Sequence, residues 1–321
     1  MSGQLIGDAV RLLGCLLAFL ILPLAIGQME HKAMAHMQGR LGPMYAGGFH
    51  GIAQLLADGV KFAQKEEVIP AAADRTVFRL APAVALVPYL VVLVVIPIGP
   101  GDQVAARLDL GLFLALAVQG IGVLGVLMAG WASANKYSLL GGLRAAAQLM
   151  AYELPLVLAA ASVATAAHTA SLPGIVDAWR PWWLAYQGVG MGVFFVAGVA
   201  ELRRPPFDMP VADSEIIFGH MTEYGGLRFA FFLLAEYAGI VVLAALTTVL
   251  YLGGWHGPLP HELGWLWTLV KIFAVGFVII WLRVSYPRMR EDQLLVLAWL
   301  RLVPLALGQL ALTGVVEVIR A

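Results

Sequence analysis

The sequence predicts an all-α fold, a polytopic bundle of about eight transmembrane helices in which residues 1–321 form a single integral membrane domain. Two observations lead to this prediction. Of the 321 residues, 61% are hydrophobic and only 12% are charged, whereas a soluble domain carries about 25% charged residues. The apolar residues also fall in runs of about 20, which is the length that a helix needs to cross a bilayer. A soluble protein of this composition would have to expose too much apolar surface to water.

Eight apolar runs have the length of a membrane span. The second, third and fourth are rich in Leu, Val and Ala and contain few charges. The seventh contains Lys271, which should face protein or water because a charge is costly in lipid, and the eighth contains Arg301 and Pro304. The first run follows no signal-peptide pattern, so we interpret it as a retained anchor. The spans are expected at residues 9–29, 77–98, 110–131, 148–168, 183–202, 228–252, 264–283 and 293–316.

The distribution of basic residues predicts the orientation of the bundle. The loops at 30–76, 132–147, 203–227 and 284–292, together with Arg79, Arg228 and Arg283 at the span ends next to them, hold 14 of the 20 Lys and Arg residues. The other side holds four, namely Arg11, Arg107, Arg180 and Arg320. Because loops rich in Lys and Arg remain in the cytoplasm, both termini are expected on the outer side of a bacterial plasma (cell inner) membrane.

The first long loop contains an amphipathic stretch. Between Phe49 and Phe62, apolar residues recur at the spacing of one helix face, while Gln54, Asp58 and Lys61 fall on the other face. One interpretation is a helix that lies flat on the membrane surface. The other is that its polar face covers a cavity shared with a partner protein.

Carboxylates form the most informative set of polar residues. They lie inside spans or in the loops at the cytoplasmic ends, where several together can exchange protons near neutral pH. Structural pairing with Arg144, Arg203 or Arg228 is the alternative explanation. The set comprises Glu30, Glu153, Glu201, Asp208, Asp213, Glu215, Glu223 and Glu236.

Other kinds of site are not supported by the sequence. The single cysteine, Cys15, can form neither an internal disulfide nor the four-thiolate set that an iron–sulfur cluster usually needs. Electrons for any redox reaction would therefore come from a partner. His256 and His261 lie off the i, i+4 spacing, so no metal site is expected, and a net charge of zero gives no argument for nucleic acid.

One long motif resembles a known family. The segment ELRRPPFDMPVADSEIIFGHMTEYGG at residues 201–226 is similar to the signature of the family that forms the H subunit of NADH–quinone oxidoreductase, respiratory complex I. Further motifs in the family order are GRLGP at 39–43, LADGVKFAQKE at 56–66, YELP at 152–155, LAEY at 234–237 and LRVSYPRMREDQL at 282–294. The resemblance covers nearly the whole chain.

The resemblance implies a subunit at the heel of the membrane arm. A quinone would enter from the bilayer between helices and the first cytoplasmic loop and be reduced mostly within peripheral subunits. A series of glutamates would then link the quinone chamber to the pumping subunits. The implied proton pathway is Glu30, Glu153, Glu201, Glu215 and Glu236, with Asp213 and Glu223 nearby. The implied quinone-binding residues are Arg40, Asp58, Arg204, Phe207 and Asp208.

The resemblance also implies partners and cofactors. The partners would be the peripheral quinone-module and iron–sulfur subunits, small membrane subunits and antiporter-like subunits, together with quinone and the lipid bilayer. This chain would bind no cofactor of its own, because the flavin and the iron–sulfur clusters belong to partner subunits. Its translocase activity would belong to the whole complex rather than to this chain.

The chain departs from the family pattern at a few positions. Arg203 occupies the place of an asparagine, Val211 that of an acid, and Leu300 that of a lysine. Two other functions remain open at this point. A membrane anchor subunit of an energy-converting hydrogenase would share the bundle but pass electrons to protons. A self-sufficient ion transporter often shows inverted repeats, and we find no repeat in the sequence.

Overall fold

The computed structural model describes residues 2–101, 107–211, 213–258 and 260–320, and within them all regular structure is helical. Eight helical segments are long and apolar enough to cross a membrane. These segments coincide with the eight predicted spans, so the predicted fold class is confirmed. They are built on α1 (Ser2–Met37), α3 (Arg75–Val95), α4 (Gly111–Ala132), α5 (Lys136–Ala167), α7 (Trp183–Glu201), α9 (Gly226–Leu250), α10 (Gly264–Ser285), and α11 (Glu291–Val296) with α12 (Val303–Arg320).

Shorter helices occupy the connections. The amphipathic stretch of the first loop forms α2 (Gln54–Gln64), which has no buried residue and packs against α9 and α1. The sequence analysis did not predict α6 (Leu172–Ala178), a short helix that starts at a proline in its first turn. The loop between α7 and α9 carries α8 (Asp213–Ile216) and a 3₁₀ turn, η2 (Gly219–Met221).

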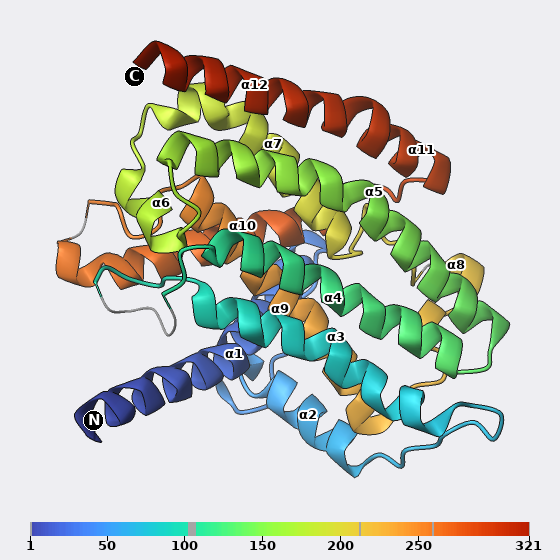
Figure 1. The fold of residues 1–321 in the computed structure, drawn as a ribbon. Helices are drawn as coiled ribbons and strands as arrows, with labels where there is room; N and C mark the ends of the chain where they lie inside the picture. The colour runs from blue at the N-terminus through green and yellow to red at the C-terminus, as the bar shows by residue number, and fades with distance from the viewer. Residues whose placement is uncertain (1, 102–106, 212, 259, 321) are drawn as a thin grey trace.

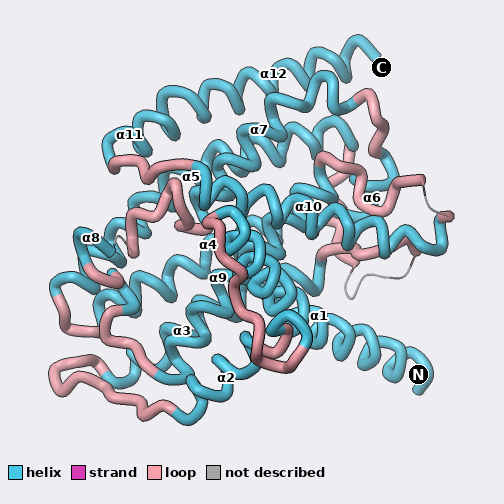
Figure 2. The backbone as a smooth tube through the Cα atoms, turned by 180° about the vertical axis from the view of Figure 1, so that it is seen from behind, coloured by secondary structure: helices cyan, strands magenta, loops and turns pink. Residues whose placement is uncertain are grey.

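The spans run up and down, so the connections gather at two ends. In Figure 1 both termini and α6 lie at the left, while α8 and the start of α11 lie at the right. Figure 2 shows from behind that the loops beside α2, α8 and α11 share one end of the bundle. We call this the loop-rich end, and it holds most of the residues discussed below.

Helix α9 is the centre of the bundle. It packs against α1, α3, α7 and α10, and every residue from 238 to 250 is buried. A helix that is apolar on all sides can be buried at the centre of the bundle, because it has no polar face that must contact water. Its N-terminal part is less buried and carries Glu236 and Tyr237 toward the loop-rich end.

Small residues allow the helices to approach closely, as is common inside membranes. A methyl group at Gly125 of α4 would lie 2.4 Å from the backbone nitrogen of Ala85 in α3. At the loop-rich end, a methyl group at Gly141 of α5 would lie 2.8 Å from the backbone nitrogen of His220. The second contact sets the distance between α5 and the loop that follows α7.

The last span contains a wide turn. Residues Leu297–Leu302 form a π-helical segment, η4, between α11 and α12. Pro304 is the second residue after this segment, and a proline lacks the N–H group that would bond to the carbonyl one turn earlier. Such turns often occur where a helix adapts to an interrupted hydrogen-bond pattern.

Lys271 in α10 faces protein, as the sequence analysis expected. Its ammonium group donates hydrogen bonds to the carbonyl oxygens of Leu252 at 2.7 Å, Gly254 at 2.8 Å and His256 at 2.7 Å. These carbonyls follow the C-terminus of α9, where carbonyl groups lack partners within the helix. One lysine therefore stabilises the turn after α9 from the neighbouring span.

Candidate functional site

The candidate residues converge on the loop between α7 and α9, residues 202–225. The Gln148 side chain of α5 holds this loop against the bundle by donating hydrogen bonds to the carbonyl oxygens of Ala200 at 2.6 Å and Phe207 at 2.8 Å. Gln148 is buried, so these bonds are shielded from competing water. The backbone of the loop is thereby fixed as one wall of the site.

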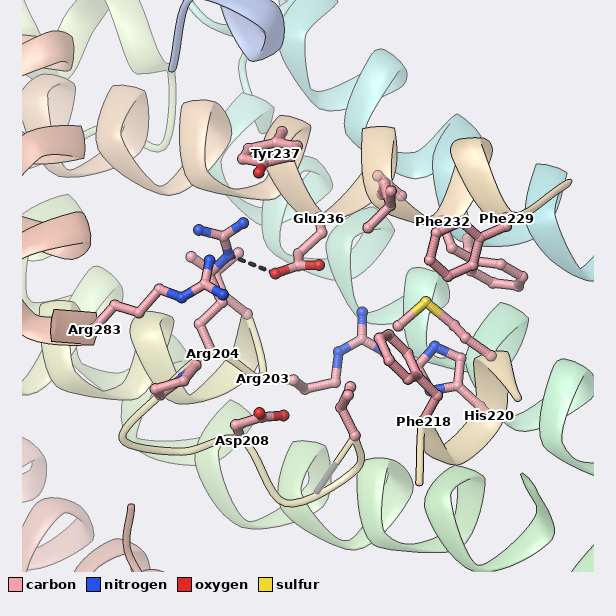
Figure 3. A pocket seen from close by; sticks show the side chains of 17 residues that line it. Arg203, Arg204, Asp208, Phe218, His220, Phe229, Phe232, Glu236, Tyr237 and Arg283 are labelled. Atoms are coloured by element: carbon pink, nitrogen blue, oxygen red, sulfur yellow. Dashed lines mark ion pairs between the residues drawn. The ribbon is translucent and has the colours of Figure 1, made fainter. Parts of the chain in front are cut away.

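A buried ionic network lies behind this wall. Glu30 of α1 and Arg204 of the loop are only 1% and 2% exposed, and they form an ion pair. Arg283 of α10 pairs with the other oxygen of Glu30. The Nε atom of Arg204 lies 2.6 Å from Oε1 of Glu236, and its guanidinium lies over the ring of Tyr237, 4.8 Å from the centroid (Figure 3).

The network balances its own charge. Two carboxylates face two guanidinium groups, which offsets much of the cost of burying Glu30 and Arg204, while Glu236 and Arg283 are 28% and 31% exposed. Burial alone lowers the pKa of Arg204, but the nearby carboxylates of Glu236 and Glu30 outweigh that effect and raise its pKa above the ordinary value. Arg204 therefore remains a permanent cation.

A polar cavity of about 270 Å³ opens beside the network. Its charged lining includes Arg203, Arg204, Asp208, Glu236 and Arg283 (Figure 3). The opposite part of the lining is aromatic and comprises Phe218, Phe229 and Phe232. A cavity with a charged wall and an aromatic wall suits a flat ring that carries polar substituents.

His220 lines the same cavity from η2 and was not singled out by the sequence analysis. Its side chain is 4% exposed and packs edge-on against Phe232, with ring centroids 5.5 Å apart. Burial, and to a smaller extent the positive charge of Arg203, lower the pKa of His220 to about 3. The imidazole is therefore neutral at physiological pH.

A second pair of carboxylate residues, Glu153 and Glu201, lies deeper in the bundle. Glu201 ends α7 and is 7% exposed. It interacts electrostatically with Glu153 of α5 and with Arg203, and the amide of Gln119 in α4 lies near it. A methyl group at Gly120 of α4 would lie 3.2 Å from Oε1 of Glu153, so that carboxylate rests on the backbone of α4.

The two carboxylate groups differ in their counter-charges. Glu30 and Glu236 both have an ion-pair partner within 4.0 Å. Among the residues that the structure describes, neither Glu153 nor Glu201 has one. The sequence analysis gave structural pairing with arginine as the alternative explanation for the carboxylates. Glu30 and Glu236 are paired in this way, but their partners are Arg204 and Arg283.

Two further cavities lie beneath α2. Arg40, His31 and Asp58 line one of about 300 Å³, where Nε of Arg40 donates to Gln38 at 2.9 Å and Asp58 lies 3.7 Å from Lys61. The other, of about 200 Å³, is mostly apolar and lies between α1, α2 and α9. Asp58 lines both of these cavities.

Two of the sequence-predicted acids lie elsewhere at the loop-rich end. Glu215 is 52% exposed and pairs with Arg144 at 2.7 Å and Arg288 at 3.5 Å. The hydrogen bond from Arg144 lowers the pKa of Glu215 below its ordinary value. Glu223 accepts a hydrogen bond from Asn135 at 2.6 Å and lines a separate surface pocket. Neither lines the polar cavity.

The two remaining predictions differ in their outcome. Phe207 is buried and packs against Tyr152, with ring centroids 5.9 Å apart, so it supports the site from behind and does not line the cavity. Asp213 starts α8, but its side chain lies outside the described residues. Among the described side chains, no three His, Cys, Asp or Glu residues are grouped as a metal site would require.

The sequence analysis did not assign a site role to Gln119, Tyr237 or His220. Tyr237 follows Glu236 in the LAEY motif, so its position next to a predicted acid was the available signal. Arg283 was counted only as a basic residue of a loop. Gln119 and His220 carry no signal of this kind, because their importance depends on contacts between distant segments.

Fold and site together define a class: a polytopic helical membrane protein with a buried glutamate–arginine network beside a polar cavity at one end. The chain belongs to the NADH dehydrogenase family, whose sequence model matches residues 10–314.

Two curated relatives of the chain carry the same name. This chain is 47% identical over 293 residues to the H subunit of NADH-quinone oxidoreductase from Geobacillus kaustophilus, a match that covers 90% of this chain and 87% of the relative. It is 45% identical over 314 residues to the protein of the same name from Bacillus cytotoxicus, covering 97% of this chain and 93% of the relative. These names favour a respiratory oxidoreductase subunit over a hydrogenase anchor.

Proposed function

We propose that this chain is the quinone-binding membrane subunit of a proton-translocating NADH–quinone oxidoreductase. The family and the relatives support the complex, and one structural observation supports the quinone path. Leu233 and Tyr237 of α9 line both the apolar cavity beneath α2 and the polar cavity, so the two cavities share a wall. An apolar tail and a polar head need such an arrangement.

The quinone path starts between α1, α2 and α9. The apolar cavity there accepts an isoprenoid chain from the bilayer, because its lining exposes far more apolar than polar surface. Arg40 and Asp58 lie at the entrance, and Arg204 and Asp208 line the cavity that receives the polar head. A guanidinium can donate hydrogen bonds to a quinone carbonyl oxygen. Reduction takes place mostly within the peripheral subunits.

The carboxylates provide the second half of the proposal. Glu236 lines the polar cavity, Glu30 lies behind it on Arg204, and Glu153 and Glu201 lie deeper in the bundle. A change of charge at the cavity alters the proton affinity of the deeper carboxylates, because charges interact strongly where water is excluded. Quinone reduction is thereby coupled to proton translocation. Asp213, Glu215 and Glu223 extend the acidic path along the loop-rich end.

The remaining partners follow from membership of such a complex. Electrons come from flavin and iron–sulfur clusters in peripheral subunits, and the chain itself catalyses no reaction. Small membrane subunits and antiporter-like subunits adjoin it in the bilayer. The chain forms one integral domain in a bacterial plasma membrane, with the loop-rich end in the cytoplasm and both termini outside.

Blocking the apolar cavity tests the quinone path. Gly59 lines this cavity from α2, and no heavy atom lies within 4 Å of the place where its Cβ would be. In Gly59→Trp, the indole fills space that the quinone tail needs. We expect the apparent KM for a long-tailed quinone to rise on the order of tenfold. Loss of the tail contacts that the indole displaces would weaken the binding free energy by about 1–3 kcal/mol.

The matched control is Gly59→Ala. This change favours the helix by up to about 1 kcal/mol without filling the cavity, so the quinone KM should remain at the wild-type value. Both variants are measured by NADH–quinone turnover in membranes that contain the assembled complex. A wild-type KM in Gly59→Trp would remove the support for this entry path.

The orientation of the chain is tested by labelling. Ala72 lies beside the start of α5, since it lines a pocket with Asn135 and Lys136. Ser171 follows the end of the same helix, so the two positions lie at opposite ends of the bundle. Single cysteines at Ala72 and Ser171, in a background without Cys15, should react with an impermeant reagent from opposite sides of the membrane, Ala72 from the cytoplasm. Reaction from the same side contradicts the eight-span topology.

A further inference from the structure

Arg203 has a backbone conformation that does not suit arginine. It follows the C-terminus of α7 with a φ of 58°, in the left-handed region. Side chains with a Cβ atom are disfavoured there, and asparagine is among the few that are enriched. The chain therefore holds an arginine where a smaller residue would fit the backbone better.

The Arg203 side chain extends into the polar cavity. Figure 3 shows it between Glu236 on one side and Phe218 with His220 on the other. Its Nη1 atom is buried, and among the described residues it has no hydrogen-bond partner. A guanidinium without an ion-pair partner keeps its full charge available to the surrounding groups.

Tyr89 of α3 lies next to this guanidinium. Tyr89 is 5% exposed and interacts electrostatically with Arg203. Methyl groups at Gly122 of α4 and Gly239 of α9 would lie 3.8 Å and 3.2 Å from the Tyr89 ring, so the ring fills a slot between these two helices. Tyr89 also interacts electrostatically with Glu201 and Glu236. The Tyr89–Arg203 pair thus lies between the two carboxylate groups.

The charges explain what this position can do. Glu30 and Glu236 are balanced by Arg204 and Arg283, whereas Glu153 and Glu201 have no ion-pair partner in the described part of the chain. Arg203 interacts electrostatically with Glu201. Glu201 also interacts with Glu153, so the two acids and Arg203 form one electrostatic cluster.

We propose that Arg203, next to Tyr89, is a positioning residue that supplies the counter-charge for Glu153 and Glu201 and lets that pair carry one negative charge. This inference rests on the proposed proton path and adds a residue to it. The ionisable and charged groups that face Arg203 or its carboxylate partners come from all adjoining elements. They are Tyr89 of α3, Glu153 of α5, Glu201 of α7, Arg204 and Asp208 of the loop, His220 of η2, Glu236 and Tyr237 of α9, and Arg283 of α10.

The test is Arg203→Asn in the assembled complex. Asparagine suits the backbone, so the yield and the melting temperature of the complex should not fall. Without the cation, the carboxylate pair ionises only at higher pH. We expect the acid limb of the pH profile of NADH–quinone turnover to move upward by about one unit. Arg203→Lys should keep the wild-type profile, and Tyr89→Phe should shift it in the same direction by less.

The controls separate three outcomes. Arg180→Asn removes an exposed arginine at the opposite end and should leave the profile unchanged. Glu201→Gln, tested in parallel, should lower turnover and proton transfer together. If Glu201→Gln behaves as wild type, the proton path itself is wrong. If Glu201→Gln is impaired while Arg203→Asn keeps the wild-type profile, or if Arg203→Lys shifts it as far as Arg203→Asn, the role of Arg203 is refuted.

Discussion

The Glu153→Gln variant should assemble normally and lose quinone reduction and proton translocation together. Glutamine has the volume of glutamate, so it fits where the carboxylate rests on Gly120. It cannot bind and release a proton, and loss of a positioned proton-transferring group typically costs about 10²–10⁴-fold in rate. We expect turnover to fall by at least about tenfold, with both activities reduced in step because the complex couples them.

Two companion variants make this result specific. Glu153→Asp keeps a titratable group at a shorter reach and should retain part of both activities. Glu262→Gln changes an exposed acid at the opposite end and should have no effect. The measurement is NADH–quinone turnover and acidification in the same membranes. If Glu153→Gln gives wild-type values for both, Glu153 only packs and hydrogen-bonds.

The Arg204→Met variant should lose stability as well as function. Arg204 is 2% exposed and pairs with both Glu30 and Glu236. Methionine replaces the aliphatic part of the arginine side chain but carries no charge, so Glu236 loses its partner and Glu30 retains only Arg283. Removing one member of a buried ion pair typically costs about 3–5 kcal/mol. We expect less assembled complex in the membrane and a lower melting temperature of the purified complex.

The ionic network predicts the behaviour of related variants. Arg204→Lys keeps the charge but cannot bridge two carboxylates in the same way, so its loss should be smaller. Adding Glu236→Gln to Arg204→Met removes the carboxylate left without a partner and should restore part of the stability. A melting temperature of Arg204→Met equal to that of the wild type would show that the network does not hold these helices together.

Local pattern was sufficient for most of the fold. Helices such as α4 and α7 follow from about 20 consecutive apolar residues, and α2 follows from apolar residues at helical spacing. The short helix α6 was missed because seven residues in a loop show no complete period. The sequence indicated that Lys271 faces protein or water, but it could not identify the three carbonyls, because these depend on how α10 lies beside the turn after α9.

The sequence identified many residues of the site, but it did not identify which of them form ion pairs with one another. Glu30 and Arg283 are separated by 253 positions, and no local spacing relates them. The motif that marked Glu215 as part of an acidic path could not show that its side chain is exposed and paired with Arg144. Arg203 was visible as a departure from the family pattern. Its position between two carboxylate groups became apparent only when α3, α7 and α9 were in place.

The Lys271 contact also limits how the site can move. It anchors α10 to the turn after α9 at one end of the bundle, while Arg283 and Glu236 lie toward the other end of the same two helices. Twelve residues separate Lys271 from Arg283, which is roughly 18 Å along a helix. Sliding of α10 along α9 would break three hydrogen bonds at once, whereas a tilt about Lys271 would keep them. A change in the tilt of α10 about Lys271 would therefore displace Arg283 at the cavity while leaving these three hydrogen bonds in place.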